Sequence, residues 1–209
     1  MAEPARELTE VRERPVLFSG EMVRAILDGR KTQTRRLVTA KSWDPTDMVL
    51  RRVVHHGDPR LGMQAYFGDE HWGIGCPFGV PGNRLWVRET WAAMVDSSTL
   101  RAKRKPLPTD SRRFRADGEM DPGFTWRPSI HMPRWASRLT LEITSVRVER
   151  LQEISEHDAT AEGFNRLTRD CKVPKFRALW DSLYAKQAPW SDNPWVWVIA
   201  FQRIPQEAP

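Results

Sequence analysis

Residues 19–38, SGEMVRAILDGRKTQTRRLV, contain two elements of different character joined at a glycine. Four apolar residues in the first half recur at helical spacing: Met22, Val23, Ile26 and Leu27. This pattern predicts a short helix with Ser19 as its N-cap and Gly29 as the left-handed residue that ends it. The run 31–38, KTQTRRLV, is rich in β-branched and long polar side chains, so it favours an exposed or half-buried strand.

The start of this strand is polar and is the first candidate site. Side chains alternate along a strand, so Thr32, Thr34 and Arg36 are expected on one face. Lys31 lies at the turn, outside the alternation, and can reach the same face. A solvated edge strand protected by its charges is an equally open interpretation.

Length and composition favour one substantial domain. At 209 residues the chain can bury a core without metal or disulfide support, and we expect a single domain over residues 15–204. Residues 1–14 are charged and poor in apolar side chains, so we interpret them as a flexible arm, and 205–209 as a tail. Two stretches, about 39–83 and 92–130, have the composition of loop insertions.

Charge and cysteine content limit the function classes. Lys and Arg outnumber Asp and Glu by 33 to 27, giving a net charge of +6 and a pI of about 9.7, which favours an anionic partner. Two separated cysteines without a CxxC motif fit a reducing, cytoplasmic setting, and no apolar run is long enough to span a membrane. Four residues could suggest a metal site, but their spacing matches no compact ligand pair: His55, His56, His71 and Cys76. We therefore expect no metal and no cofactor.

The other elements follow from periodicity. Alternating or apolar runs predict strands, with a bulge near Thr144 and Ser145, at five places: 14–19, 49–54, 84–91, 139–151 and 195–204. Helices are predicted over 155–164 and 174–186. The second helix has four expected core anchors: Phe176, Leu179, Trp180 and Leu183. This order predicts an α+β fold whose strands curl into a small mixed β-barrel flanked by short helices.

Two further segments carry charged candidates. Glu89 lies in an apolar strand, which indicates either a functional carboxylate or a salt bridge to Arg88 or Arg84. The basic run 101–115 is either a solvated loop or a contact for nucleic-acid phosphates.

Aromatic residues gather in a third segment. Residues 124–138 combine two prolines with His131, Arg134 and Trp135, which suits a rigid binding loop or a packing element. Ten tryptophans against two tyrosines are present in the chain, and an exposed tryptophan can stack on a base.

Four segments, in their order along the chain, carry a resemblance to a known family: GRKTQTRR at 29–36, PGNRLWVRE at 81–89, LTLEITSVRVERL at 139–151 and WVWVIAF at 195–201. The chain resembles the ASCH domain family of the PUA-like superfamily, in particular the long ASCH-like proteins of phages and prophages. The resemblance implies an RNA-binding-like barrel with a cleft beside the GRKT strand. Some small bacterial members are amidohydrolases that remove the acetyl group of N(4)-acetylcytidine with a Lys, a Thr and a Glu.

The resemblance assigns these roles by motif. The Lys matches Lys31 and the Thr matches Thr34, while the Glu best matches Glu162, with Glu153 and Glu156 nearby. The chemistry is coherent, because a buried lysine of lowered pKa can deprotonate a threonine hydroxyl and a carboxylic acid can protonate the leaving amine. Seven residues are expected to bind the substrate: Arg35, Arg36, Glu89, Trp91, His131, Arg134 and Trp135.

Two alternatives stay open. In the first, the chain is an RNA-binding or modified-base-binding module, or a ribonuclease, in which Lys31, Arg35, Arg36 and the 101–115 run form an anion track. In the second, suggested by the phage-like resemblance alone, it is a phage structural or assembly protein. The expected partner is therefore a modified nucleoside or a single-stranded nucleic acid and not a membrane, and the sequence indicates no oligomeric state.

Overall fold

A computed structural model describes residues 11–40, 45–56, 62–68, 72–93, 112–119, 124–164 and 171–205. The fold is mixed α+β and consists mostly of strands. Its main sheet has five strands in this spatial order: β1 (Glu13–Leu17), β6 (Arg84–Arg88), β9 (Thr140–Arg150), β10 (Trp195–Ile204) and β2 (Gln33–Leu37). The β1–β6 pair is parallel and the other pairs are antiparallel.

Strand β10 is an interior strand of the sheet and is buried, as its apolar sequence predicts. It pairs with β9 on one side and β2 on the other, and residues 196–199 are fully buried on both faces. The β9–β10 register shifts at Thr144, because Ala200 pairs with Ser145 whereas Phe201 pairs with Ile143. The predicted bulge is thereby confirmed, and it bends the long β9 strand.

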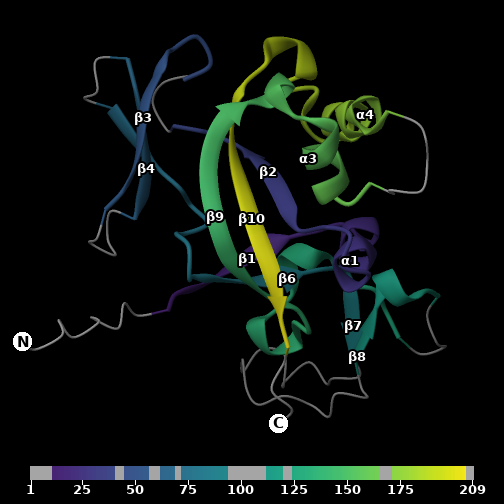
Figure 1. The fold of residues 1–209 in the computed structure, drawn as a ribbon. Coiled ribbons are helices and arrows are strands. Elements are labelled where there is room, and N and C mark those ends of the chain that lie inside the picture. Colours follow the sequence, from purple (N-terminus) through teal and green to yellow (C-terminus); the bar gives the residue numbers. More distant parts are fainter. Residues whose placement is uncertain are drawn as a thin grey trace, which may run out of the picture.

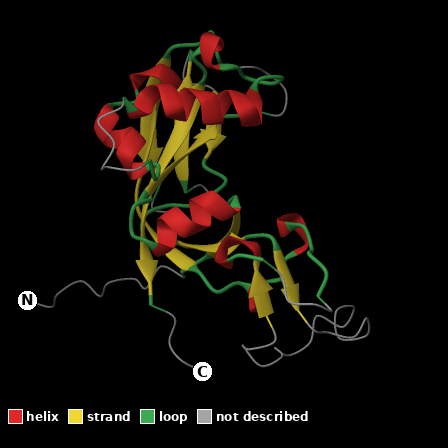
Figure 2. Ribbon diagram, turned by 90° about the vertical axis from the view of Figure 1, so that its right-hand side faces the viewer, coloured by secondary structure: helices red, strands yellow, loops and turns green. Residues whose placement is uncertain are grey.

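Each face of the main sheet is covered by a different layer (Figure 1). One face packs on a three-stranded sheet of β3 (Leu50–His55), β4 (Met63–Phe67) and β5 (Trp72–Gly75), and together they enclose the largest apolar cluster. The other face is covered by α3 (Glu156–Ala161) and α4 (Lys172–Tyr184), which lie in front of the strands in Figure 2. The main sheet is therefore the middle layer of three.

Helix α1 (Gly20–Leu27) leads into β2. The Ser19 hydroxyl accepts a hydrogen bond from the Met22 amide, and Gly29 adopts a positive φ of 70°, so the predicted helix and both of its caps are confirmed. Beside α1 lies a small sheet of β7 (Trp91–Ala93) and β8 (Arg112–Phe114). Short 3₁₀ turns complete the described elements: η2 (Arg115–Asp117), η3 (Ser129–His131), η4 (Arg134–Ala136), η5 (Leu151–Glu153) and η6 (Trp190–Asp192).

Three expectations need correction. The stretch 39–83 is not merely a loop with one hairpin strand, because Met63, Ala65 and Phe67 alternate inward and make it a core layer. Leu183 is not a core anchor, since it is 59% exposed at the end of α4. Nor does the sheet close into a barrel, because in the described part of the chain no ladder joins the edge strands β1 and β2.

A side chain bridges these two edges instead. Arg36 on β2 donates a hydrogen bond of 2.6 Å from Nη2 to the carbonyl of Leu17 on β1. The expected arm 1–14 lies outside the described residues up to position 10, and Glu13 already belongs to β1. Within the described ranges, no helix has the length and apolar character needed to cross a bilayer.

Candidate functional site

Backbone pairing holds the end of α3 against the start of β2. Lys31 and Glu162 form an isolated antiparallel bridge, and the Thr32 amide donates to the Ala161 carbonyl at 2.8 Å. Gly163 makes this approach possible, because its φ is +110° and a Cβ there would lie 2.9 Å from the Cβ of Ala25. Backbone geometry therefore sets the position of Glu162 relative to Lys31.

Lys31 and Glu162 form a buried ion pair. Nζ of Lys31 donates to Oε2 of Glu162 at 2.7 Å and to its backbone carbonyl at 2.9 Å. The two side chains are 1% and 5% exposed. The other carboxylate oxygen of Glu162 accepts from Nη1 of Arg35 at 3.2 Å, so one carboxylate is shared by two cations.

Burial lowers the pKa of Lys31. The charge and hydrogen bond of Glu162 oppose this shift, while the positive charges of Arg36 and Arg35 add to it. The Lys31 amine is thus easier to deprotonate than an exposed lysine. A lysine in this state can act as a base, which is the role predicted for it.

Arg35 belongs to a wider charge network on the helix-covered face of β2. Its fully buried guanidinium binds Glu149 and lies 3.6 Å from Asp158 as well as contacting Glu162. Burial alone would raise the pKa of Asp158, but hydrogen bonds from Ser155 and Gln33 and the charge of Arg35 lower it to about 2. Arg35 is therefore enclosed by carboxylates, and its expected contact with substrate or phosphate is not supported.

Thr34 and Arg36 lie on the opposite face of β2. Thr34 is buried, and among the described residues no hydrogen bond joins it to Lys31 or Glu162. The ring of Phe18 connects the two faces, because the Lys31 Nζ lies 5.6 Å and the Arg36 Cζ 5.4 Å from its centroid. Lys31 and Arg36 therefore share the ring of Phe18 as a neighbour, while the carboxylate that binds Lys31 also binds Arg35.

The guanidinium of Arg36 has a buried donor, Nε–H, besides the donor that binds Leu17. Nη2 is bonded to Leu17, but Nε is buried and has no partner in the described part of the chain. A buried N–H without an acceptor is costly and rare in folded proteins. Arg36 lies two residues after Thr34 and therefore on the same face of β2.

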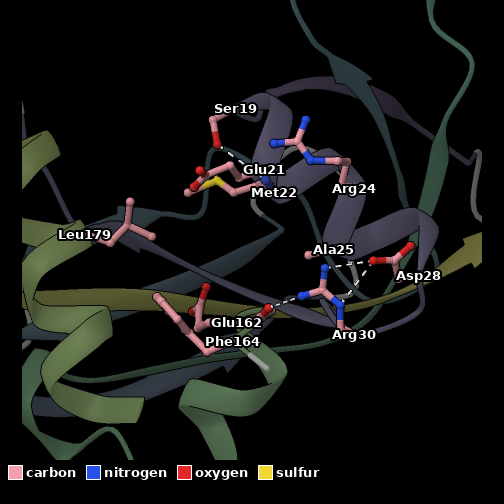
Figure 3. A pocket seen from close by; sticks show the side chains of 11 residues that line it. Ser19, Glu21, Met22, Arg24, Ala25, Asp28, Arg30, Glu162, Phe164 and Leu179 are labelled. Carbon is pink, nitrogen blue, oxygen red and sulfur yellow. Dashed lines mark hydrogen bonds and ion pairs between the residues drawn. The ribbon is translucent and has the colours of Figure 1, made fainter. Parts of the chain in front are cut away.

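A cavity of about 320 Å³ opens between α1 and the segment after α3 (Figure 3). Its walls come from α1, the turn after it, the 162–164 segment and α4: Ser19, Glu21, Met22, Arg24, Ala25, Asp28, Arg30, Glu162, Gly163, Phe164 and Leu179. Glu162 is thus both the partner of Lys31 and part of the cavity wall. Sequence reasoning missed Phe164 and the α1 residues as site residues, since helical spacing marks an apolar face without showing what covers it.

The two arginines of this cavity are held by protein oxygens. Arg24 donates to the Ala116 carbonyl at 3.1 Å, and Arg30 pairs with Asp28 at 2.8 Å and also binds the Gly163 carbonyl. Both guanidinium groups therefore stabilise the walls of the cavity through these contacts.

Glu89 lies in a different buried ion pair. It is 1% exposed, and Arg138 binds both of its carboxylate oxygens, at 2.9 and 3.1 Å. Burial raises the pKa of Glu89 and the arginine opposes that rise. The salt-bridge interpretation is the one supported, but the partner is Arg138 and neither Arg88 nor Arg84.

The aromatic candidates Trp91 and Trp135 belong to a small apolar cluster with Phe114 and Met132. Trp91 is 1% exposed and meets Trp135 edge to face at 5.5 Å between ring centroids, so its ring is not available to stack on a base. Arg134 is bound to Glu13 at 2.7 Å, and His131 is exposed in η3. None of these four residues lines the cavity, and of the other predicted site residues Glu162 does, whereas Lys31, Thr34, Arg35 and Arg36 are not among the lining residues.

The choice among the three candidate glutamates favours Glu162. Glu153 accepts the Arg150 amide at 2.8 Å, and Glu156 accepts the Lys172 amide at 2.7 Å at the start of α4, so both serve local structure. Residues 101–111 of the expected anion track, and His71, lie outside the described residues. Among the described residues, no group of three or more His, Cys, Asp or Glu side chains is arranged to hold a metal ion.

No family model, curated protein or solved structure matches the chain. The contacts of the Lys31 and Glu162 side chains therefore carry the functional argument.

Proposed function

We propose that this protein is an ASCH-type, PUA-like amidohydrolase that removes an acyl group from a modified nucleoside such as N(4)-acetylcytidine. The observation that carries the proposal is the buried Lys31–Glu162 pair, of which Glu162 lies in the wall of the cavity. A charged pair with so little exposure costs desolvation free energy and is a weak source of stability, which favours a chemical role.

The pair supplies a base and an acid by one proton transfer. Lys31 Nζ lies 2.7 Å from Glu162 Oε2, so the ammonium proton can move along this bond and leave a neutral amine beside a carboxylic acid. The burial that lowers the pKa of Lys31 favours this transfer.

The reaction then follows in balanced steps. The Lys31 amine takes the proton of the Thr34 hydroxyl while its oxygen forms a bond to the acyl carbon. The tetrahedral intermediate breaks the bond between that carbon and the nucleoside nitrogen, which receives the proton of Glu162. Water, deprotonated by the Glu162 carboxylate, attacks the threonine ester. The acid is released, and the proton that Lys31 holds returns to the threonine oxygen.

Arg36 suits the stabilisation of the intermediate. Its buried, unpartnered Nε–H lies on the strand face of Thr34, where the carbonyl oxygen becomes an oxyanion. The cavity supports a nucleoside-sized ligand, because about 320 Å³ lies at the small end of ligand sites and its wall includes Met22, Phe164 and Leu179.

The test is release of the acyl group from a panel of acylated cytidine, adenosine and guanosine. Thr34→Ala is expected to lower turnover roughly a thousandfold or more while ligand binding persists. Thr32→Ala is the matched control, because this exposed threonine lies on the same segment and its loss should leave turnover unchanged. Absence of acyl release from every nucleoside of the panel would refute the proposal.

A further inference from the structure

Arg35 joins the carboxylate of Glu162 to a buried charge network. Its Nη1 donates a hydrogen bond of 3.2 Å to Oε1 of Glu162, and its Nε donates one of 3.1 Å to Oε1 of Glu149. Its Nη2 also binds Glu149 and lies 3.6 Å from Oδ2 of Asp158. The ring of Phe176 packs near the guanidinium, with 5.7 Å between the ring centroid and Cζ of Arg35. These contacts together hold a guanidinium that is fully buried.

A second arginine of the same network does not reach Glu162. Nε of Arg147 binds Oε2 of Glu149 at 2.9 Å, and its Nη2 binds Oδ1 of Asp158 at 3.0 Å. Arg147 is 42% exposed, and no contact joins it to Glu162 in the part of the chain that the structure describes. Of the two arginines, it is therefore Arg35 that contacts the candidate catalytic pair.

The contact with Arg35 sets the orientation of the Glu162 carboxylate. Rotation about the last side-chain bond of a glutamate has no sharp preference of its own, so hydrogen bonds decide where the two oxygens point. In Glu162, Oε1 is held by Arg35, and Oε2 lies 2.7 Å from Nζ of Lys31. Because both oxygens belong to one planar group, fixing Oε1 also fixes Oε2. The short path for a proton between Lys31 and Glu162 thus depends on Arg35.

We propose that Arg35 is a positioning residue of the amidohydrolase, which binds Oε1 of Glu162 and so keeps Oε2 as the oxygen that exchanges protons. Oε2 receives the proton of the Lys31 ammonium, gives it to the leaving nitrogen and later takes a proton from the attacking water. Arg35 does not line the cavity, so it acts on the reaction through Glu162 and not on the substrate. The inference rests on the proposed function and deepens it, because it gives a task to a buried arginine that the substrate does not touch.

Two double variants that share one substitution test this role. Arg35→Met/Glu149→Gln removes the contact with Glu162, and Arg147→Met/Glu149→Gln is the matched control that keeps it. Each removes one charge of either sign from the same network, so a general effect on the fold is common to both. Urea denaturation checks that both proteins fold, and the measurement is kcat and KM for acetate release from N(4)-acetylcytidine by the full chain.

The Arg35→Met/Glu149→Gln variant should show a loss in kcat and not in KM. We expect kcat to fall about 10- to 100-fold, the effect of displacing a catalytic group by roughly 1 Å. KM should not change, because Arg35 makes no contact in the cavity. The control variant should keep both constants of the wild type.

The outcomes separate this inference from the proposed function. Equal kcat values in the two double variants would overturn the inference alone, as would a raised KM at unchanged kcat when Arg35 is lost. A wild type that releases no acetate would overturn the proposed function and the inference with it. If Arg35→Met/Glu149→Gln fails to fold, Arg35→Lys decides, because an ammonium keeps the charge but lacks the fork that binds Glu149 and Glu162 at once. In Arg35→Lys kcat should fall at unchanged KM, and a wild-type kcat would overturn the inference.

Discussion

Replacement of Glu162 by Gln tests the buried ion pair in its physical terms. The substitution keeps the shape of the side chain and removes the charge that Lys31 and Arg35 share. Breaking a buried pair costs about 3–5 kcal/mol, because one charge stays buried without compensation. Lys31 keeps the Glu162 backbone carbonyl at 2.9 Å and Arg35 keeps Glu149, so we expect the lower end, about 3 kcal/mol.

Urea denaturation followed by tryptophan fluorescence measures this loss. With a slope of about 3 kcal/mol per molar urea, the midpoint should fall by about 1 M. Lys31→Met alone should destabilise the fold for the same reason, since it leaves Glu162 without its lysine. The double variant Lys31→Met/Glu162→Leu should recover most of either loss, because two apolar side chains replace a pair that was costly to bury.

Two results would refute this reasoning. A loss below about 1 kcal/mol in Glu162→Gln would give the pair the value of a solvent-exposed salt bridge. A double variant as unstable as the sum of the two single variants would mean that Lys31 and Glu162 do not interact in the folded protein.

Three more predictions concern Lys31, Gly163 and Arg138. The pKa of Lys31 is lowered on folding, so the unfolded chain holds that proton more tightly than the folded protein does. The free energy of unfolding of wild type, compared with that of Lys31→Met in urea titrations, should therefore rise with pH up to about 10.5. A difference that does not change with pH would contradict the lowered pKa. Gly163→Ala should lower the free energy of unfolding by about 1–3 kcal/mol, and by more than Gly82→Ala does. Both glycines have a positive φ, but only Gly163 has atoms close to the position of an added Cβ. Equal urea midpoints for the two variants would show that this crowding is irrelevant. Arg138→Met should destabilise the fold by about 3 kcal/mol, because it leaves the buried Glu89 carboxylate without its cation. The kcat/KM of the folded fraction should not change. A changed kcat/KM would indicate that Glu89 takes part in the site after all.

Local patterns predict the elements of this fold well. The Ser19 cap, the Gly29 stop, the bulge at Thr144 and the β10 strand each depend on residues close in sequence, and each is confirmed. The missed β4 strand, MQAYF, shows the limit, because its alternation is short and lies among turn-forming residues. Whether the strand order closes into a barrel depends on the pairing of β1 with β2, which no local pattern encodes.

The site divides in the same way. Lys31 is marked by its motif, but its contact with Glu162 crosses 131 positions and depends on the backbone conformation at Gly163. Glu89 attracts attention as a carboxylate in an apolar strand, yet its partner is Arg138, which the sequence does not connect to it. Sequence therefore identifies buried charges better than it identifies which charges meet.

Turnover of N(4)-acetylcytidine by the Lys31→Met/Glu162→Leu double variant tests the central claim most directly. This variant lacks the base and the acid but should fold about as stably as wild type, so loss of structure cannot explain a loss of activity. We predict active wild type and Thr32→Ala proteins and a double variant that releases acetate no faster than buffer. A folded double variant that turns over at the wild-type rate would show that the Lys31–Glu162 pair is structural and not catalytic.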